Sequence, residues 1–479
     1  MNFKTIRHIL SSVLKIEALC MFLPLICALV YGEYETVLPW IISMAVCTVF
    51  GFVFSIRTKG ERTMFAREGF VSVALSWILM SIFGSLPFIL TGSITNYFDA
   101  FFETVSGFTT TGASILSDVE SLPNSVLFWR SFTHWIGGMG VLVFLVALLP
   151  LSGSGNLHLL RAESTGPAVS KLVPKVKSTA KILYLIYIAM TLIQIILLWC
   201  GEMNFFEAVT HSFGTAGTGG FGIKNDSLAG YSTYSQIVIT VFMILFGIDF
   251  SIFHLILLGK IKDAVRSDEL KVYLSVIVLS ITFICINCFN MYSSLGEAVN
   301  HSSFQVASIM TTTGFSSVDF NLWPEFSKNI LVVLMFLGAC AGSTGGGIKI
   351  SRIILLIKGI AKEIKIMAHP KSIYKIKMNG RIIEHETVRS VNVFMIAYLV
   401  IFVVSMILIS LDNFDFTTNF TSVAATINNI GPGLAGVGPT ANFSIFSDFS
   451  KFILSLNMLI GRLEVFPLLL LFSPYTWKK

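Results

Sequence analysis

The sequence predicts an all-α integral membrane protein, in which an N-terminal two-helix hairpin precedes four pseudo-symmetric units around a central pore. Hydrophobic residues make up 54% of the 479 residues and charged residues only 13%, whereas charged residues make up roughly 25% of a soluble domain. The longest apolar runs reach the roughly 20 residues that a helix needs to cross a bilayer. A short glycine-containing motif recurs four times, each time between two such runs.

Ten membrane-spanning helices are expected in chain order. The first two, near residues 12–31 and 36–56, form a hairpin without a motif in residues 1–68. The other eight flank the motifs in pairs: 71–92 with 125–150 in residues 69–160, 180–200 with 235–259 in residues 161–266, 271–290 with 329–358 in residues 267–380, and 390–411 with 445–473 in residues 381–479. Each unit is therefore a helix, a re-entrant segment and a second helix.

Positive charge alternates along the connections between these helices. Basic connections at residues 57–67, 158–181, 259–271 and 358–389 alternate with acidic or neutral ones at 93–124, 201–234, 290–328 and 412–444. Because basic connections stay on the cytoplasmic side of a membrane, both termini are expected in the cytoplasm and the motifs on the outer side. Solvation of basic loops alone would explain the charge but not its alternation.

A short helix is expected before each motif. Thirteen residues before the motif glycine lie Asp99, Glu207, His301 and Thr418, three of which suit the start of a helix. The C-terminal end of such a half-crossing helix carries partial negative charge and would favour a cation. His211 and His301 fit buried hydrogen-bonding groups better than proton relays.

The four motifs predict a ring of backbone carbonyls around a monovalent cation. They read Thr110-Thr111-Gly112-Ala113, Thr218-Gly219-Gly220-Phe221, Thr312-Thr313-Gly314-Phe315 and Asn429-Ile430-Gly431-Pro432. Carbonyl dipoles replace the water of an ion without a formal charge that would trap it, and glycine permits the backbone angles that turn them to one axis. The expected filter residues are Thr111, Gly112, Gly219, Gly220, Thr313, Gly314, Ile430 and Gly431, with Thr110, Thr218, Thr312 and Asn429 as additional lining.

A glycine-rich run interrupts the last helix of the third unit. Gly338-Ala-Cys-Ala-Gly-Ser-Thr-Gly-Gly-Gly347 lies inside a predicted span, and glycine costs up to about 1 kcal/mol per helical position relative to alanine. The run should therefore form a loop that could obstruct the pore as a gate; a packing kink is the alternative. It lacks the lysine spacing of a phosphate-binding loop. The expected gate residues are Gly342, Ser343, Thr344, Gly345, Gly346, Gly347 and Arg462.

Arg462 lies within the last predicted span, where an unpaired arginine is costly and usually faces a cavity or the bundle interior. We expect its guanidinium to meet the carbonyls of the glycine-rich run. Glu464 lies about 200° around a helix from Arg462, so the two should not face each other. Snorkelling to the cytoplasmic interface is the alternative for Arg462.

The motifs together resemble the Trk/Ktr/HKT superfamily of potassium transporters, and the two extra N-terminal helices resemble its TrkH/TrkG branch. The resemblance is carried by Glu103-Thr-Val-Ser-Gly-Phe-Thr-Thr-Thr-Gly-Ala-Ser, Trp135-Ile-Gly-Gly-Met-Gly-Val, Ala341-Gly-Ser-Thr-Gly-Gly-Gly-Ile-Lys and Gly461-Arg462. It implies potassium at Gly112, Gly220, Gly314, Gly431 and their preceding residues. It also implies a homodimer in the bacterial inner membrane, with one pore per protomer and a cytosolic nucleotide-binding ring of TrkA type. The segments 358–389 and 152–181 are suitable docking surfaces for that ring.

Gated potassium permeation is therefore the expected function, with K⁺ as the transported ion, lipid and protein as partners, and no cofactor or nucleic acid. A proton- or sodium-coupled potassium symporter remains the alternative. An enzyme is not expected, because His385-Glu386-Thr-Val-Arg389 fails the HExxH zinc pattern at its last residue.

Overall fold

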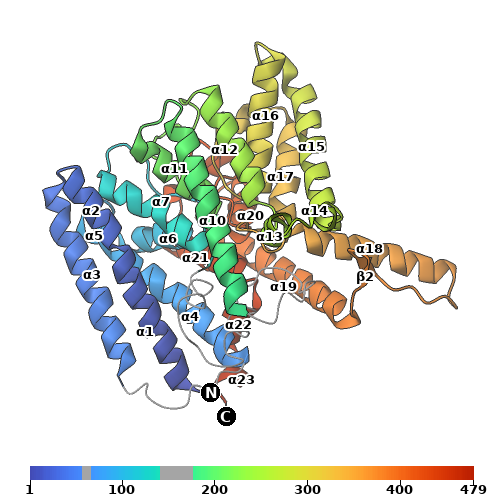
Figure 1. The fold of residues 1–479 in the computed structure, drawn as a ribbon, viewed down its shortest axis with the longest axis horizontal. Helices are drawn as coiled ribbons and strands as arrows, with labels where there is room; N and C mark the ends of the chain where they lie inside the picture. The colour runs from blue at the N-terminus through green and yellow to red at the C-terminus, as the bar shows by residue number, and fades with distance from the viewer. Residues whose placement is uncertain (57–65, 141–175, 479) are drawn as a thin grey trace.

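The structure is a computed structural model that describes residues 1–56, 66–140 and 176–478. The described chain is mostly helical, and its two ends lie together at one end of the molecule (Figure 1). Most of the predicted docking segment 152–181 lies outside the described residues. The segment that follows α18 projects to one side of the bundle (Figure 1).

The N-terminal hairpin packs on the first unit. It comprises α1 (Phe3–Cys20), α2 (Phe22–Val30) and α3 (Tyr34–Ser55). The first helix therefore begins earlier than the sequence indicated, and it is divided at Met21. Helix α1 contacts both α3 and α4, whereas much of the α3 surface is left exposed to the surroundings.

Four units follow. The first contains α4 (Ala66–Gly84), α5 (Leu86–Leu90), α6 (Tyr97–Phe108) and α7 (Asn124–Gly138), and the second α10 (Val176–Trp199), α11 (Phe205–Gly217), α12 (Thr233–Phe246), α13 (Phe250–Leu257) and α14 (Ile261–Val265). The third contains α15 (Asp268–Cys288), α16 (Leu295–Met310), α17 (Glu325–Leu337) and α18 (Ile350–Ala368). The strands β1 (Lys377–Met378) and β2 (Arg381–Ile382) lie where the third predicted unit passes into the fourth, and the fourth also contains α19 (His385–Ile409), α20 (Phe416–Ile427), α21 (Asp448–Arg462), α22 (Phe466–Phe472) and α23 (Pro474–Trp477). The two strands pair as an antiparallel hairpin, and 3-10 turns occur at Phe289–Met291, Phe320–Leu322, Ser410–Asp412, Ala435–Val437 and Phe443–Ile445.

The helices of the four units contact one another in a closed cycle. The helix that follows each motif packs against the short helix of the next unit: α7 on α11, α12 on α16, α17 on α20, and α21 back on α6. The four short helices therefore occupy the centre, and residues Ala100 to Phe108 of α6 are all buried. A helix that is buried all round belongs to the interior of a bundle.

The predicted count of ten spans is not reached by length and apolar character alone. Six described helices are long and apolar enough to cross a membrane, and α12 with α13 forms a seventh if the pair, bent by 90°, is one span. In the third and fourth units the helices that follow the motifs are interrupted and so fall short of the required length. Helix α17 ends at Gly338, and α21 ends before Glu464 and Val465, which both have positive φ. Helix α7 is described only to Gly138, so the rest of the predicted span 125–150 falls outside the described residues.

The short helices begin upstream of the residues that the sequence indicated. Their N-caps are Asn96, Asn204, Ser294 and Asp415, and each side chain accepts a backbone N–H of the first turn. Asp99, Glu207 and Thr418 lie in the first turn instead, and His301 lies well inside α16. The signal at these positions was therefore charge near the helix start rather than the cap itself.

Candidate functional site

The four motifs lie together in a ring. A Cβ atom added to Gly112 would lie 2.0 Å from the carbonyl oxygen of Gly219, one on Gly220 would lie 2.0 Å from that of Thr313, and one on Gly314 would lie 2.0 Å from that of Ile430. The fourth contact closes the cycle, since a Cβ on Gly431 would lie 2.8 Å from the carbonyl oxygen of Thr111. Each motif glycine therefore packs against the carbonyl that precedes the glycine of the next motif. No side chain larger than hydrogen fits between them.

The backbone of the four motifs is locally equivalent. In each one, the residue two places before the glycine has a φ between 55° and 59°: Thr110, Thr218, Thr312 and Asn429. The motif glycines have φ values of 80°, 76°, 86° and 99°. The residue before each glycine donates its N–H to a carbonyl near the end of the short helix, at 2.8 Å in all four cases. A positive φ is a conformation that residues with a Cβ atom rarely adopt, so its recurrence at both positions of all four motifs marks one shared loop geometry.

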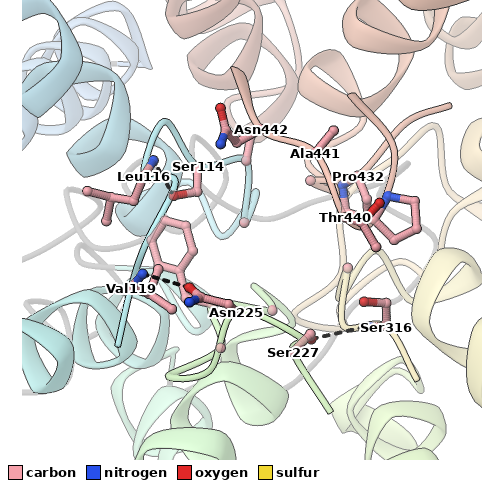
Figure 2. A pocket seen from close by; sticks show the side chains of 18 of the residues that line it. Ser114, Leu116, Val119, Asn225, Ser227, Ser316, Pro432, Thr440, Ala441 and Asn442 are labelled. Atoms are coloured by element: carbon pink, nitrogen blue, oxygen red, sulfur yellow. Dashed lines mark hydrogen bonds between the residues drawn. The ribbon is translucent and has the colours of Figure 1, made fainter. Parts of the chain in front are cut away.

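A cavity of about 130 Å³ opens on one side of this ring. All four motif glycines line it, together with residues that follow them in the chain, such as Ser114, Asn225, Ser316 and Pro432 (Figure 2). We refer to the loops around it as loop 1 (residues 109–116), loop 2 (218–224), loop 3 (311–317) and loop 4 (428–434). Four of the predicted filter residues, the motif glycines, thus line one cavity, and Thr111, Gly219, Thr313 and Ile430 lie against them through the contacts of the ring.

Two carboxylates in the connections that carry the motifs are held in their ionised form. The side-chain amide of Asn225 donates to Asp118 at 2.8 Å and lowers the pKa of that exposed carboxyl. The hydroxyl and backbone N–H of Thr418 lower the pKa of Asp415 in the same way. Both carboxylates remain negative at neutral pH.

The glycine-rich run forms a loop, residues 338–349, beneath the ring. A Cβ on Gly345 would lie 2.9 Å from the carbonyl oxygen of Thr311, and one on Gly346 would lie 2.4 Å from that of Asn428. The Gly346 N–H donates to the Thr312 hydroxyl at 2.6 Å. The glycine-rich loop therefore sits directly against the motifs of the third and fourth units.

Arg462 joins the glycine-rich loop to the first unit. Its Nη1 donates to the carbonyl of Thr344 at 2.9 Å and to the hydroxyl of Thr110 at 3.2 Å. Its Nη2 donates to the carbonyls of Gly137, at 2.5 Å, and Gly138, at 2.8 Å. Glu464 faces elsewhere and pairs with Arg352 at 2.5 Å. The guanidinium is thus shared between the loop, a motif residue and the end of α7.

Two further side chains hold the glycine-rich loop, and the sequence analysis missed both. A carboxylate oxygen of Glu269 accepts the backbone N–H of Ala341 at 2.7 Å and that of Ser351 at 3.1 Å. The Lys349 ammonium donates to the carbonyl of Gly345. Lys349, two positions after the glycine-rich run, was visible as a charge at its edge, whereas Glu269 lies 72 positions from Ala341 and no local pattern indicated it.

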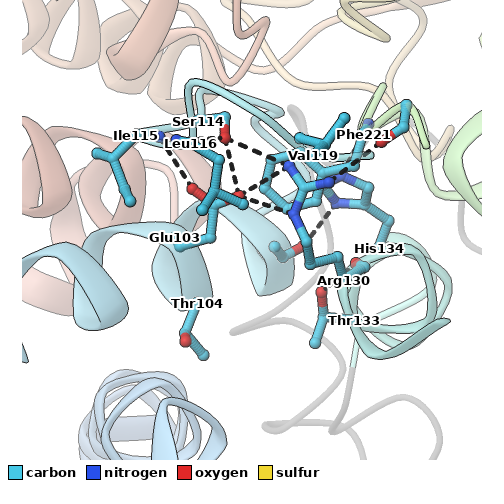
Figure 3. Close-up of polar contacts among 12 residues, drawn as sticks. Glu103, Thr104, Ser114, Ile115, Leu116, Val119, Arg130, Thr133, His134 and Phe221 are labelled. Atoms are coloured by element: carbon cyan, nitrogen blue, oxygen red, sulfur yellow. Dashed lines mark hydrogen bonds and ion pairs between the residues drawn. The ribbon is translucent and has the colours of Figure 1, made fainter. Parts of the chain in front are cut away.

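A buried charge cluster behind loops 1 and 2 was also missed. Helix α7 carries Arg130, 2% exposed, and His134, fully buried, and Arg130 pairs with the fully buried Glu103 of α6 (Figure 3). Glu103 entered the sequence analysis only as part of a motif. A glutamate and an arginine within two apolar segments of one unit were the signal that could have found this pair.

A bundle of apolar helices that encloses four converging glycine loops defines a multi-pass membrane protein of the cation-transport class. A family model described as TrkH, a cation transport protein, matches residues 40–479. The chain therefore belongs to the TrkH family, whose members are transport proteins rather than enzymes.

Similar proteins cover the whole chain. The Trk system potassium uptake protein TrkH of Salmonella typhimurium is 38% identical over 100% of both chains. The Trk system potassium uptake protein TrkG of Escherichia coli is 32% identical over 100% of this chain and 99% of its own. The crystal structure of the potassium transporter TrkH from Vibrio parahaemolyticus superposes with a TM-score of 0.89, at 33% identity and full coverage of both chains.

Proposed function

We propose that this protein takes up potassium across the bacterial inner membrane, through the axis on which its four motif loops converge. The observation that carries the proposal is the closed cycle of glycine-to-carbonyl contacts, because it holds main-chain oxygens from all four units around one axis. The potassium uptake proteins that resemble this chain over its full length support the choice of ion.

The chemistry of the ring suits a monovalent cation. The four motifs carry no charged side chain, so an ion would meet carbonyl dipoles strong enough to replace its water but too weak to trap it. The four short helices end immediately before the motifs, and the partial negative charge at each C-terminal end adds to the attraction. In this proposal the units form ten spans around the pore, with both termini in the cytoplasm.

The glycine-rich loop is the proposed gate. It contacts motif residues of the third and fourth units, and Arg462 adds a positive charge to the same place. An ion leaving the ring would therefore meet both a steric and an electrostatic barrier. Displacement of residues 338–349 from beneath the ring would open the path.

Control of this gate is assigned to a cytosolic nucleotide-binding subunit of TrkA type, acting on a homodimer of the chain. Helix α18 begins directly after the glycine-rich loop, so a displacement of α18 would also move the end of that loop. A groove of about 840 Å³ lies between α18, the β1–β2 hairpin and the start of α19, with Lys362, Lys375 and Arg389 among its lining. This groove is the proposed docking surface.

Flux through the purified full-length protein in liposomes tests the proposal. With potassium, rubidium, sodium and lithium compared in turn, potassium and rubidium are expected to pass fastest. A protein that passes sodium as readily as potassium would contradict the filter assignment.

Reversal potentials separate permeation from coupled symport. A potential that follows the potassium gradient alone supports a channel-like path. A potential that also shifts with the proton or sodium gradient supports the symporter instead.

A further inference from the structure

Helix α7 presents two polar side chains to the junction between loops 1 and 2. Arg130 and His134 are four residues apart, so they lie on the same face of the helix. Both are buried, and both contact residues that precede and follow the motif glycines (Figure 3).

Arg130 connects the two loops through its guanidinium. Nε and Nη2 lie 2.9 and 2.8 Å from one oxygen of Glu103, and Nη1 donates to the carbonyl of Gly222 at 3.1 Å. The guanidinium also lies 4.1 Å from the ring centroid of Phe221, the residue after the second motif glycine. The planar guanidinium has five N–H donors in a fixed geometry, so it can contact Glu103, Gly222 and Phe221 at the same time, whereas a lysine ammonium lacks that geometry.

Glu103 links Arg130 to loop 1 through hydrogen bonds. The oxygen that faces Arg130 also accepts the Ser114 hydroxyl at 3.0 Å, and the other oxygen accepts the Ile115 N–H at 3.0 Å. The two buried charges are thus compensated by each other and by hydrogen bonds to loop 1.

His134 adds a second link between the loops. Its Nδ1 lies 2.8 Å from the carbonyl of Gly107, and its Nε2 accepts the Phe221 N–H at 3.2 Å. These partners require a neutral imidazole with its proton on Nδ1. A Cβ on Gly219 would lie 2.2 Å from the imidazole ring, so the ring supports the backbone of loop 2 directly.

We propose that Glu103, Arg130 and His134, named here the inter-loop cluster, are positioning residues that set ion selectivity by fixing loop 2 against loop 1. The inference rests on the proposed function of the loops as a potassium filter. The contact that it fixes is the one between Gly112 and the carbonyl of Gly219, whose oxygen would face the ion. Among the described residues, none of the other ion pairs joins two motif loops; the pair of Lys451 with Asp99 joins α21 to the first turn of α6 instead.

Fold stability alone does not account for the cluster. Apolar residues of similar volume often stabilise a protein as well as a buried ion pair does. An ion pair with directed hydrogen bonds differs from an apolar contact because it fixes positions and angles. Backbone spacing of a few tenths of an ångström matters where carbonyl oxygens replace water around an ion.

Three variants remove the cluster one part at a time: Arg130→Gln, Glu103→Gln and His134→Phe. Lys451→Met is the matched control, because Lys451 forms a buried ion pair with Asp99 of α6 at 2.5 Å without contacting any motif loop. Each purified full-length protein is reconstituted in liposomes, and its potassium-to-sodium permeability ratio is measured beside that of the unmodified protein.

The Arg130→Gln variant is expected to lower this ratio about tenfold, which corresponds to about 1.4 kcal/mol of lost preference. Glu103→Gln and His134→Phe should lower it less, and the Glu103→Gln/Arg130→Gln double variant should lose less than the sum of the two single changes. Lys451→Met should leave the ratio within about twofold of the original, because the ion pair of Lys451 lies at the first turn of α6, whereas the motif follows the other end of that helix. Sodium flux should rise in the cluster variants while the elution volume in size-exclusion chromatography stays unchanged.

Unchanged ratios in folded Arg130→Gln protein would overturn the proposal. If that variant does not fold, unchanged permeability ratios in folded Glu103→Gln and His134→Phe proteins would overturn the proposal in its place. An unmodified protein that does not prefer potassium would instead refute the filter assignment, and the two failures are therefore distinguishable.

Discussion

The motif ring and the glycine-rich loop beneath it are both built from glycine-containing backbone, yet they are held in different ways. In the ring, three of the four glycines pack so closely on the next carbonyl that an added Cβ would lie 2.0 Å from its oxygen. The glycine-rich loop is held mainly by side-chain hydrogen bonds, from Arg462 and Glu269 outside the loop and from Lys349 at its own C-terminal end.

If the glycine-rich loop is the gate, as proposed above, this difference separates a fixed element from a movable one. Main-chain packing between loops changes only if the loops themselves rearrange. Hydrogen bonds from single side chains can break one at a time, and each typically contributes about 1.5–3 kcal/mol when one partner is charged. Glycine in the ring therefore permits close approach, whereas glycine in the loop permits several conformations of similar energy.

Gly112→Ser is the strongest test of the fixed element. The new Cβ would lie 2.0 Å from the carbonyl oxygen of Gly219, and the residue would keep a φ of 80°. We expect the potassium-to-sodium permeability ratio to fall by about tenfold or more, the equivalent of at least 1.4 kcal/mol.

Two matched changes sharpen that test. Gly92→Ser has a similar φ of 72° but no atom within 4 Å of the added Cβ, so the ratio should not change. Gly431→Ser should have a smaller effect than Gly112→Ser because its nearest atom is 2.8 Å away. Equal ratios for Gly112→Ser and Gly92→Ser would show that crowding in the ring does not control selectivity.

Deletion of Gly345–Gly347 tests the movable element. The deletion removes the residues that contact Thr311 and Asn428 and the hydrogen bond from Gly346 to Thr312. Potassium flux without a cytosolic partner is expected to rise about tenfold, because contacts equivalent to about 1.4 kcal/mol are lost. Rubidium uptake into liposomes measures it, and lower uptake by folded protein would contradict the gate.

Arg462→Ala should raise basal flux about tenfold, since it removes at least one charged hydrogen bond to the loop, which typically contributes about 1.5 kcal/mol or more. The same uptake assay applies, with Lys451→Met as the control for loss of a buried cation. Selectivity should change less than flux, because Arg462 contacts no motif glycine carbonyl in the described residues. A change in selectivity without a change in flux would assign Arg462 to the ring instead.

Asp118→Asn is expected to have the smallest effect. Asn225 lowers the pKa of Asp118, so their contact is complete above the ordinary carboxyl pKa and is lost as pH falls through the lowered value. Because the pair is exposed, neither the substitution nor acidification to pH about 5, above the ordinary pKa of about 3.9, should alter the permeability ratio. A clear pH dependence between pH 5 and pH 7 that disappears in Asp118→Asn would show that the outer contact between loops 1 and 2 also sets selectivity.

The sequence predicted the features that depend on composition and local pattern. The apolar runs gave the helices α10, α15 and α19 closely, and the motif spacing gave the four loops. Their positions follow from local backbone chemistry, since only glycine combines a positive φ with an approach as close as that of Gly112 to Gly219.

The contacts between units could not be predicted in the same way. Glu103 and Arg130 are separated by 27 positions, and Glu269 and Ala341 by 72, so no local pattern connects them. The bend between α12 and α13 was also missed, because Asp249 caps α13 within what reads as one continuous apolar run. Charged residues inside apolar segments were visible, but their partners depend on the assembled bundle.

The contacts around the ring pass from each unit to the next in chain order and then return from the fourth to the first. In an assembly of four identical subunits, every mutation changes all four subunits at once. One contact between neighbouring subunits therefore cannot be changed without changing the other three. A single polypeptide with four diverged quarters can alter one contact and leave three untouched. The selectivity of such a protein can therefore be tuned in steps, and the same freedom makes each quarter separately accessible to engineering.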